Sequence, residues 1–460
     1  MANEKILQEI LFNLKNEIVP KWYPLSLDME DGGYFSNLSH DFKILPEQDK
    51  MIVTQARHIW ALSKLSHFLG DENFEDYAFH GYKFLKDKMW DDNYGGFYTI
   101  RNREGGYSSL NGYLEEKRTY GNAFAVYGLA ALYELSKDEN VLNLTKDTFN
   151  WIEEKAADKK HNGYFQFLTR EGIPFDKNSQ HKTIAIDADE VGFKDQNSSI
   201  HLLEAYTELY NVWKSAEVYS RLKNILFLVR DVITNKNGYL TLFFDTDWNP
   251  ISFQNASPEI REKNYGLDHV SFGHNYETAF LMLEASYSLG LKDDTKTLSA
   301  AKKMMDHAIE NGWDNNSAGF FDEGYYFNGS DKCKIIKDTK VWWAQAEGLN
   351  ALLLFSKIFP DEKKYFELFL KQWEYIKKYL IDTEHGDWYW GSLEKKPFYK
   401  TEPKANIWKG TYHTARALMN CIKMLSDENF SLIKTNENFM KEKIKFNNMI
   451  KHWEDITKKL

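Results

Sequence analysis

The pentapeptide DGGYF at residues 31–35 has four close counterparts further along the chain, and this recurrence decides the fold. The counterparts are YGGFY at 94–98, HNGYF at 161–165, KNGYL at 236–240 and SAGFF at 317–321, with a more divergent sixth copy, HGDWYW, at 385–390. The marker glycines are 63, 67, 75, 81 and 67 residues apart; they are Gly33, Gly96, Gly163, Gly238, Gly319 and Gly386. Each interval has room for two helices of about 12 to 18 residues, so the sequence predicts six helical hairpins.

The segments between these glycines carry apolar residues at helical spacing, as Phe124, Tyr127 and Ala131 do in GNAFAVYGLAALYEL. The glycine and aromatic pairs predict short turns or β-hairpins that interrupt the helices on one side of the molecule. Six two-helix units close most economically as an all-α (α/α)6 barrel, whose inner helices line a central cleft. An open solenoid is the alternative, but the sequence shows no polar capping units at its two ends.

We expect one catalytic domain, the barrel, over residues 1–424. Residues 425–460 lack the repeat and predict one or two amphipathic helices packed on or near the barrel. We assign no catalytic role to this extension.

Composition excludes several classes of protein. The 460 residues are 43% hydrophobic and 27% charged with nine prolines, which excludes a disordered or collagenous chain. The formal charge of -10 gives no footprint for nucleic acid, and no apolar run approaches the roughly 20 residues of a membrane span. Aromatic residues make up 16%, which suits a large core and equally a sugar ligand with apolar faces.

Two cysteines, Cys333 and Cys421, cannot supply a disulfide framework, and no cysteine and histidine cluster has the spacing of a structural zinc site. The first 20 residues mix acids and lysines and lack the apolar core of a signal peptide. We therefore expect a cytoplasmic protein with no metal and no cofactor, either a monomer or a weak homodimer.

Polar side chains stand beside aromatic ones in three blocks of the predicted helices. Arg57 lies in ARHIW, Tyr120 in KRTYGNAF, and Asn197 and His201 lie at i and i+4 in NSSIHLLEAYTELY. An arginine at a helix start is usually solvated, and a lone histidine on a half-buried helix is more often a satisfied core residue. None of the three blocks is specific by itself.

Two further blocks pair ionisable with aromatic residues. In SFGHNYETAF, His274 and Glu277 stand at i and i+3, so the carboxylate can reach one imidazole nitrogen and raise the basicity of the other. An exposed pair of this kind would do nothing comparable, and both interpretations stay open. The last block runs from VWWAQAEGL to WKGTYHTARAL and contains the tryptophan and acidic cluster of Trp343 and Glu347, followed by Trp408 and His413.

In this order the blocks resemble the N-acylglucosamine 2-epimerase superfamily, and most closely its cellobiose 2-epimerase branch. The resemblance runs from about Arg57 to Arg416 and is carried by RHIW at 57–60, NAF at 122–124, HLLEAYTELYNVW at 201–213, GHNYE at 273–277, WWAQAE at 342–347, GDWYW at 386–390 and WKGTYHTAR at 408–416. It implies an (α/α)6 barrel and metal-independent epimerisation at C2 of a reducing-end sugar, which makes a small carbohydrate the expected partner.

The resemblance also implies roles for individual residues. His274 and His413 would be the acid/base pair, with Glu277 supporting His274 and Arg57 facing the substrate oxygens. The residues that would bind the sugar are Tyr120, Asn197, His201, Trp343, Glu347, Trp388 and Trp408.

The chain departs from the family pattern at several positions. Asn275 replaces a usual Asp and Phe280 a common Trp, while Gly410 and Thr411 replace a Cys-Pro pair and Thr414 an Asn. Both histidines and Glu277 are kept, so these departures bear on the identity of the sugar more than on the reaction.

The proposed chemistry explains the residue types. The C2 proton of an open-chain aldose is barely acidic, so a fixed cation such as Arg57 is needed at the carbonyl oxygen. Delivery of a proton to the opposite face needs a second group that works near neutral pH, and two imidazoles suffice without a metal. The expected intermediate is a cis-enediol.

Three alternatives stay open. The first is a monosaccharide 2-epimerase or aldose-ketose isomerase of the same superfamily. The second is a glycoside hydrolase on the same toroid, which would use two carboxylic acids and for which Asp187, Asp189 and Glu190 are candidates. The third is a catalytically silent sugar-binding or partner-binding toroid, which the retention of both histidines disfavours.

Overall fold

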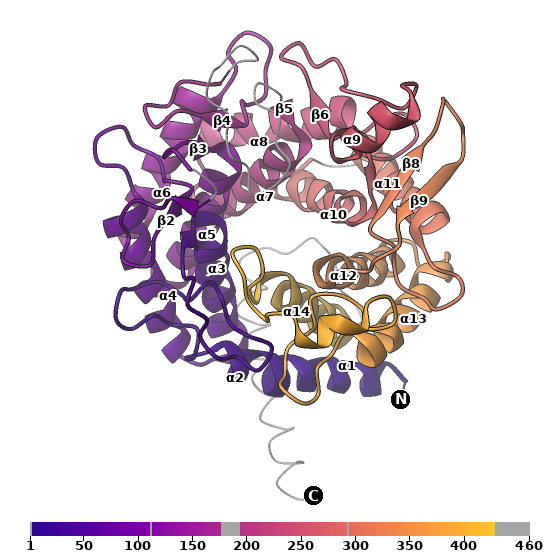
Figure 1. Ribbon diagram of the computed structural model, residues 1–460, viewed down its shortest axis with the longest axis horizontal. Helices are drawn as coiled ribbons and strands as arrows, with labels where there is room; N and C mark the ends of the chain where they lie inside the picture. The colour runs from indigo at the N-terminus through magenta and orange to yellow at the C-terminus, as the bar shows by residue number, and fades with distance from the viewer. Residues whose placement is uncertain (1, 111–112, 176–193, 292–293, 428–460) are drawn as a thin grey trace, which may run out of the picture.

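Six helices stand side by side around a central axis and form an inner ring (Figure 1). The computed structural model describes residues 2–110, 113–175, 194–291 and 294–427. Each inner helix contacts the next, and the last contacts the first, so the ring is closed. The inner helices are α3 (Ile52–Leu69), α5 (Thr119–Ser136), α7 (Gln196–Val212), α10 (Phe272–Ser288), α12 (Trp342–Ile358) and α14 (Tyr412–Ser426).

A second set of helices surrounds this ring (Figure 1). In α13 the aromatic and aliphatic residues Phe369, Trp373 and Ile376 are buried, as a helix covered on one side requires. The expected (α/α)6 barrel is therefore the observed fold. The outer helices are α1 (Ala2–Phe12), α4 (Asn73–Phe84), α6 (Glu139–Trp151), α8 (Ala216–Leu228), α11 (Thr295–Gly312) and α13 (Lys364–Tyr379).

Shorter helical pieces complete the rings. Four outer helices continue into π-helical turns, which are η1 (Asn13–Ile18), η2 (Leu85–Met89), η4 (Ile152–Ala156) and η5 (Val229–Ile233). Three other short helices are α2 (Val19–Trp22), α9 (Pro258–Asp268) and η6 (Pro397–Thr401). No helix in the described residues is both long and apolar enough to cross a membrane.

The two ends of the chain meet to close the outer ring. Helix α1 contacts α14 and so serves as the outer partner of the last inner helix. The sixth glycine turn packs on this N-terminal segment, because the N–H of Asp387 donates to the carbonyl of Glu17 at 2.8 Å. A Cβ atom on Gly386 would lie 2.5 Å from that carbonyl oxygen. The sixth hairpin is thus assembled from both termini of the barrel.

The glycine turns share one construction. In the first turn, Asp28 accepts hydrogen bonds from the backbone N–H groups of Glu30 and Asp31, and Gly33 has φ +69°, which favours glycine. Lys50 lies just before the next inner helix, is fully buried, and donates to Asp28 at 2.9 Å. The same buried pair recurs as Asp91–Lys117, Asp158–Lys194, Asp314–Lys340 and Asp382–Lys404.

The fourth turn is the exception to this charge pairing. It begins with the neutral Asn235, and the buried Val270 occupies the place of the lysine two residues before the inner helix. Asn235 and Val270 thus replace the aspartate and the lysine together. Replacing only one of them would leave a buried charge without a partner, which is costly.

Short antiparallel ladders join these turns at the end of the barrel where the inner helices begin (Figure 1). They confirm the expected β-hairpin pieces on one side of the molecule. The pairs are β1 (Lys50–Met51) with β2 (Ile100–Arg101), β3 (Lys117–Arg118) with β4 (Phe167–Leu168), β5 (Lys194–Asp195) with β6 (Phe243–Phe244), and β7 (Val270–Ser271) with β8 (Glu323–Tyr326), which also pairs with β9 (Cys333–Lys337).

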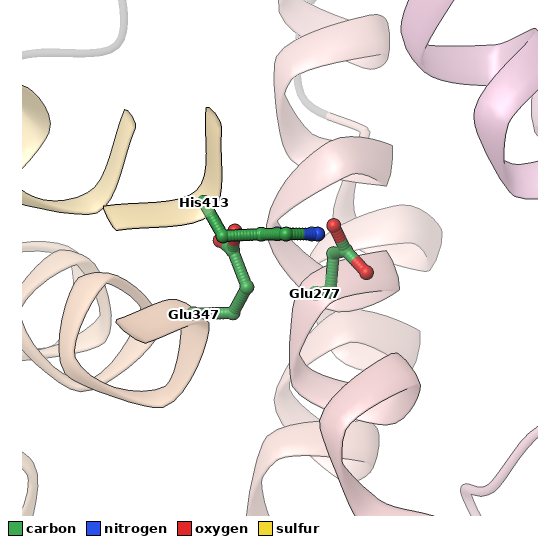
Figure 2. Close-up of side chains that lie close together, drawn as sticks. All are labelled: Glu277, Glu347 and His413. Atoms are coloured by element: carbon green, nitrogen blue, oxygen red, sulfur yellow. The ribbon is translucent and has the colours of Figure 1, made fainter. Parts of the chain in front are cut away.

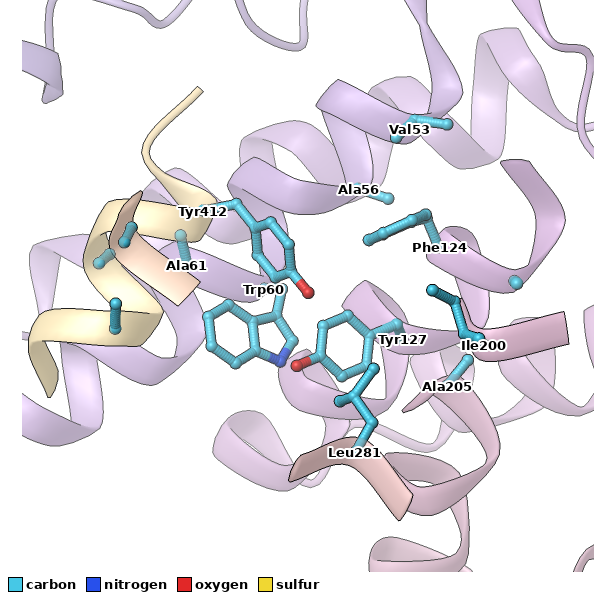
Figure 3. Close-up of a cluster of buried hydrophobic side chains, with 14 of the residues drawn as sticks. Val53, Ala56, Trp60, Ala61, Phe124, Tyr127, Ile200, Ala205, Leu281 and Tyr412 are labelled. Atoms are coloured by element: carbon cyan, nitrogen blue, oxygen red, sulfur yellow. The ribbon is translucent and has the colours of Figure 1, made fainter. Parts of the chain in front are cut away.

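Aromatic side chains pack against one another inside the inner ring (Figure 3). The ring of Trp60 stacks on Tyr127 with centroids 5.2 Å apart, and it meets the edge of Tyr412 at the same distance. These residues come from α3, α5 and α14, so three inner helices share one aromatic cluster. Offset and edge-to-face contacts of this kind stabilise the packing beyond the area they bury.

A cavity of about 440 Å³ lies outside the inner ring, between the third glycine turn and α8. In three other turns an aromatic residue of the following outer helix covers the glycine, namely Phe84, Trp151 or Tyr375. In the third turn the smaller Leu228 stands there, together with Trp248. The cavity follows from this smaller side chain and is separate from the residues predicted to carry chemistry.

Candidate active site

The six inner helices or the segments just before them carry nearly all the sequence-predicted site residues, close to the start of each helix. Three of these residues contact one another across helices: Trp343 packs against His274 and His413, with ring centroids 4.9 and 5.7 Å apart. Because the helices converge on one axis, residues far apart in the sequence meet there. The residues concerned are Arg57, Tyr120, Asn197, His201, His274, Glu277, Trp343, Glu347, Trp408 and His413.

His413 is held by a carboxylate. Its Nδ1 lies 2.7 Å from Oε1 of Glu347, and both side chains are buried. Burial lowers the pKa of His413 well below its ordinary value, with Arg57 and Arg416 acting in the same direction. Burial raises the pKa of Glu347 to about 8. One proton is therefore shared between the two groups near neutral pH, and Nε2 of His413 is left for chemistry.

A second carboxylate faces the free side of the same imidazole. Figure 2 shows the ring of His413 pointing from Glu347 toward Glu277. Both carboxylates are tied to one guanidinium, since Nη2 of Arg416 lies 2.5 Å from Glu277 and 2.6 Å from Glu347. Glu277 thus stands within reach of a positive charge on His413.

One nitrogen of His413 and one oxygen each of Glu277 and Glu347 lie within 4.8 Å of one another, a spacing that a metal ion can use. The guanidinium of Arg416 already bonds both carboxylates. A divalent cation would have to displace that buried guanidinium, so the donor set fits an ion-pair cluster better than a metal centre.

His201 has the same kind of support as His413. Its Nδ1 lies 2.9 Å from Oε2 of Glu204, and Glu204 also accepts hydrogen bonds from Tyr412 and Arg416. Burial alone would raise the pKa of Glu204, but Arg416 and His201 lower it to about 2. Glu204 was not among the predicted residues, although its i+3 spacing from His201 matches that of Glu277 from His274.

His274 has a neutral partner. The hydroxyl of Ser271 is 2.9 Å from its Nδ1, which leaves Nε2 for chemistry. Burial lowers the pKa of His274 to about 3, with His201, His269 and Arg57 adding to the effect. This imidazole is therefore neutral near pH 7, and unlike His413 it has no carboxylate partner at its Nδ1 with which to share a proton.

Arg57 lies at the same end of the barrel with two neighbours. It donates to the hydroxyl of Tyr120 at 3.0 Å and to the backbone carbonyl of Trp408 at 3.2 Å. Its Nε is buried without a hydrogen-bond partner in the described residues, and so is Oδ1 of Asn197. Unpaired buried polar atoms are costly, so these two atoms are candidates for contact with a polar ligand.

Two expectations about carboxylates need correction. Glu277 does not support His274, which is bonded to Ser271, and its ion pair is with Arg416 from another helix. Glu347, expected to bind the sugar, is fully buried, and its Oε1 orients His413. The local sequence pattern correctly indicated that both residues lie near the histidines. It could not indicate their hydrogen-bond partners, which come from distant parts of the chain.

Trp388 was expected to bind sugar, but the structure places its side chain in the core. Its side chain is fully buried, and its indole N–H donates to Oδ1 of Asn13 at 2.9 Å. The aromatic residue of the sixth turn is a core residue for the same reason as those of the other turns: it anchors the turn, here to the N-terminal segment.

The departures from the family pattern include four buried side chains, Asn275, Phe280, Thr411 and Thr414. Asn275 is fully buried and accepts from the backbone N–H of Leu240 in the fourth turn. Thr411 bonds the hydroxyl of Tyr23, and Thr414 the carbonyl of Thr411. Phe280 packs against the guanidinium of Arg416.

Part of the sequence analysis concerns residues that the structure does not describe. The hydrolase candidates Asp187, Asp189 and Glu190 lie outside the described residues, as does the predicted C-terminal extension from residue 428 onward.

Comparison of the sequence with known proteins identifies the family of this chain. The family model of N-acylglucosamine 2-epimerase matches residues 33–417. The chain belongs to the N-acylglucosamine 2-epimerase family.

Individual relatives narrow the class within the family. A cellobiose 2-epimerase of Ruminococcus albus is 31% identical over 419 residues, 91% of this chain and 98% of that protein. A cellobiose 2-epimerase of Bacteroides fragilis is 29% identical over 426 residues, covering 92% of this chain and all of that protein. The solved cellobiose 2-epimerase of Bacillus thermoamylovorans superposes with a TM-score of 0.78 at 25% identity over 91% of this chain and 99% of that one. This family member is thus an isomerase of the carbohydrate 2-epimerase class.

Proposed function

We propose that the protein epimerises C2 of the reducing-end glucose of a β-1,4-linked disaccharide such as cellobiose or lactose, through two histidines and a cis-enediol intermediate. The observation that carries this proposal is the packing of His274 and His413 against the same Trp343, each with its Nδ1 bonded and its Nε2 without a hydrogen bond from the described residues. The names of the relatives favour a disaccharide over a monosaccharide.

The reaction uses the different Nδ1 partners of the two histidines, a hydroxyl for His274 and a carboxylate for His413. After the sugar ring opens, Nε2 of the neutral His274 takes the C2 proton, and the C–H electron pair forms the C1–C2 double bond. Negative charge passes to the carbonyl oxygen, where Arg57 stabilises it. The protonated His413–Glu347 pair then returns a proton to C2 from the opposite face, and the carbonyl forms again. In the other direction the two histidines exchange roles.

The carboxylates support this cycle electrostatically. Glu347 lets His413 alternate between donor and acceptor without a buried isolated charge, and Glu277 lies near the imidazolium that forms in the reverse direction. Both carboxylates bond Arg416, and Glu347 also bonds His413, so neither stands as the isolated acid that a hydrolase uses.

The test is incubation with cellobiose, lactose, mannose, glucose and N-acetylglucosamine in separate reactions, with products identified by NMR. We expect the manno epimer of the disaccharides at the reducing end, at a rate that a chelator leaves unchanged. Conversion of free monosaccharides alone would make the protein a monosaccharide epimerase or isomerase. Release of monosaccharides from cellobiose would make it a hydrolase.

A further inference from the structure

A single guanidinium lies among three buried carboxylates from three different helices. Arg416 on α14 pairs with Glu204 of α7, with Glu277 of α10 at 2.5 Å and with Glu347 of α12 at 2.6 Å. All four side chains are at most 4% exposed. Among the described residues, no lysine or other arginine forms an ion pair with any of the three carboxylates, so one positive charge faces three acids.

Two of the three carboxylates orient histidines of the site. Glu204 bonds Nδ1 of His201, and Glu347 bonds Nδ1 of His413. Glu277 has no partner among the described residues other than Arg416 at hydrogen-bond distance. A change at Arg416 therefore reaches both histidines without touching either of them.

The charge count has a chemical consequence. Three ionised carboxylates and one guanidinium would leave two uncompensated negative charges in a buried cluster, which is costly. A proton bound between His413 and Glu347 reduces that excess. The cluster thus favours the protonated form of the pair, while the guanidinium prevents it from holding the proton too tightly.

The other charged groups around His413 do not replace Arg416. Arg57 of α3, His201 of α7 and His274 of α10 face the same space, and Tyr127 of α5 lies next to Tyr412. On the outer side, Glu9 of α1 is bonded to Lys377 and Glu17 of η1 to Asn13. Burial raises the pKa of Glu284 on α10 to about 7, an effect that Arg416 opposes and Glu204 adds to.

Resting on the proposed function, we propose that Arg416 is a positioning residue that sets the proton occupancy of the His413–Glu347 pair and fixes the carboxylates that orient His201 and His413. Its planar fork is needed because one ammonium group cannot span carboxylates from three helices. The effect of the charge of Arg416 can therefore be separated from the effect of its shape by different substitutions.

Three variants separate them. Arg416→Gln removes the charge, so the alkaline limb of the pH–rate profile should move upward by about one unit, with kcat lowered on the order of 10²-fold and KM nearly unchanged. Arg416→Lys keeps the charge, so the limb should stay in place while kcat falls about tenfold or more. Arg416→Gln combined with Glu277→Gln removes one charge of each sign and should return the limb toward its wild-type position.

A measurement without substrate keeps this test independent of the proposed function. The infrared band of a protonated carboxyl group, identified by its loss in Glu347→Gln, should titrate at higher pH in Arg416→Gln than in the wild type. Arg103→Gln is the matched control, because Arg103 is ion-paired with Asp28, Glu30 and Asp31 in the first turn. It should shift neither the band nor the profile.

The proposal is overturned if the carboxyl band and the alkaline limb keep their wild-type positions in Arg416→Gln, or if Arg416→Lys retains wild-type kcat. If Arg416→Gln does not fold, the charge-balanced double variant and Arg416→Lys decide the matter by the same two readouts. A protein inactive on every sugar would refute the proposed function, and the infrared titration would still decide the role of Arg416.

Discussion

Nδ1 of His413 lies 2.7 Å from Oε1 of Glu347, and the two buried groups share one proton. His274, by contrast, is bonded to the neutral hydroxyl of Ser271. The two candidate catalytic histidines therefore differ in the charge of the group that supports them, and the rate should depend on pH accordingly.

The first consequence concerns pH. The pKa of Glu347 is raised to about 8, and the protonated pair is the active acid. The rate should therefore be full below pH 8 and fall tenfold per unit as pH rises beyond it. The pKa of His274 is lowered to about 3, so this base should stay competent down to about pH 5. Initial rates with cellobiose from pH 5 to 10 check both limbs, and a flat profile between pH 8 and 10 would contradict the shared proton.

Glu347→Gln should lower kcat by about 10- to 100-fold with little change in KM. The amide can still occupy the space beside His413, but it cannot carry the proton between turnovers. The measurement is steady-state kinetics together with the pH profile, whose alkaline limb near 8 should be lost. Glu374→Gln is the control, because Glu374 is exposed on α13 and paired with Lys377. An equal effect in both variants would rule out a specific role for Glu347.

Substitution of Trp343 should affect sugar binding, whereas substitution of Trp388 should affect stability. Trp343→Ala removes the ring that packs against both histidines and should raise KM on the order of tenfold or more. Trp388→Phe leaves Oδ1 of Asn13 without its indole donor, so it should cost about 1 to 3 kcal/mol of stability. KM should stay unchanged in this second variant. Kinetics and calorimetry on both proteins check the contrast, and a raised KM in Trp388→Phe would restore Trp388 to the sugar site.

The buried lysines under the glycine turns should matter for stability rather than for activity. Lys340→Met leaves the buried Asp314 with only the more distant Lys395, 3.8 Å away, and should cost about 3 kcal/mol. Adding Asp314→Asn should recover most of that loss, because the fourth turn already uses the neutral Asn235 with Val270. Melting temperatures of the single and double variants provide the measurement. A double variant no more stable than Lys340→Met would show that the pair is not the cause.

The fold could be predicted from the sequence because its turns have a local requirement. Each turn needs residues that accept positive φ, such as Gly96 and Gly163, and such residues recur visibly. The role of α1 in closing the outer ring could not be predicted in this way, because no glycine turn precedes this helix. It depends on long-range contacts such as that between Glu17 and Asp387.

The site could be predicted as a set of residues but not as a set of partners. The i, i+3 spacing of His274 and Glu277 indicates a shared helix face and nothing more. The partner of Glu277 is Arg416, which is 139 residues away. Trp388 shows the converse error, because an aromatic residue in a motif with polar neighbours is indistinguishable by sequence from one that anchors a turn in the core.

The central claim is that His274 and His413 act on opposite faces of one enediol, and solvent isotope exchange tests it most directly. In D₂O, the wild-type protein should replace the C2 proton of the reducing-end residue with deuterium while forming the manno epimer. His274→Ala and His413→Ala should each lose net epimerisation by on the order of 10² or more. Each folded variant should still exchange the C2 proton of the one epimer whose proton faces its remaining histidine. Near wild-type epimerisation by either folded variant would contradict the two-base assignment.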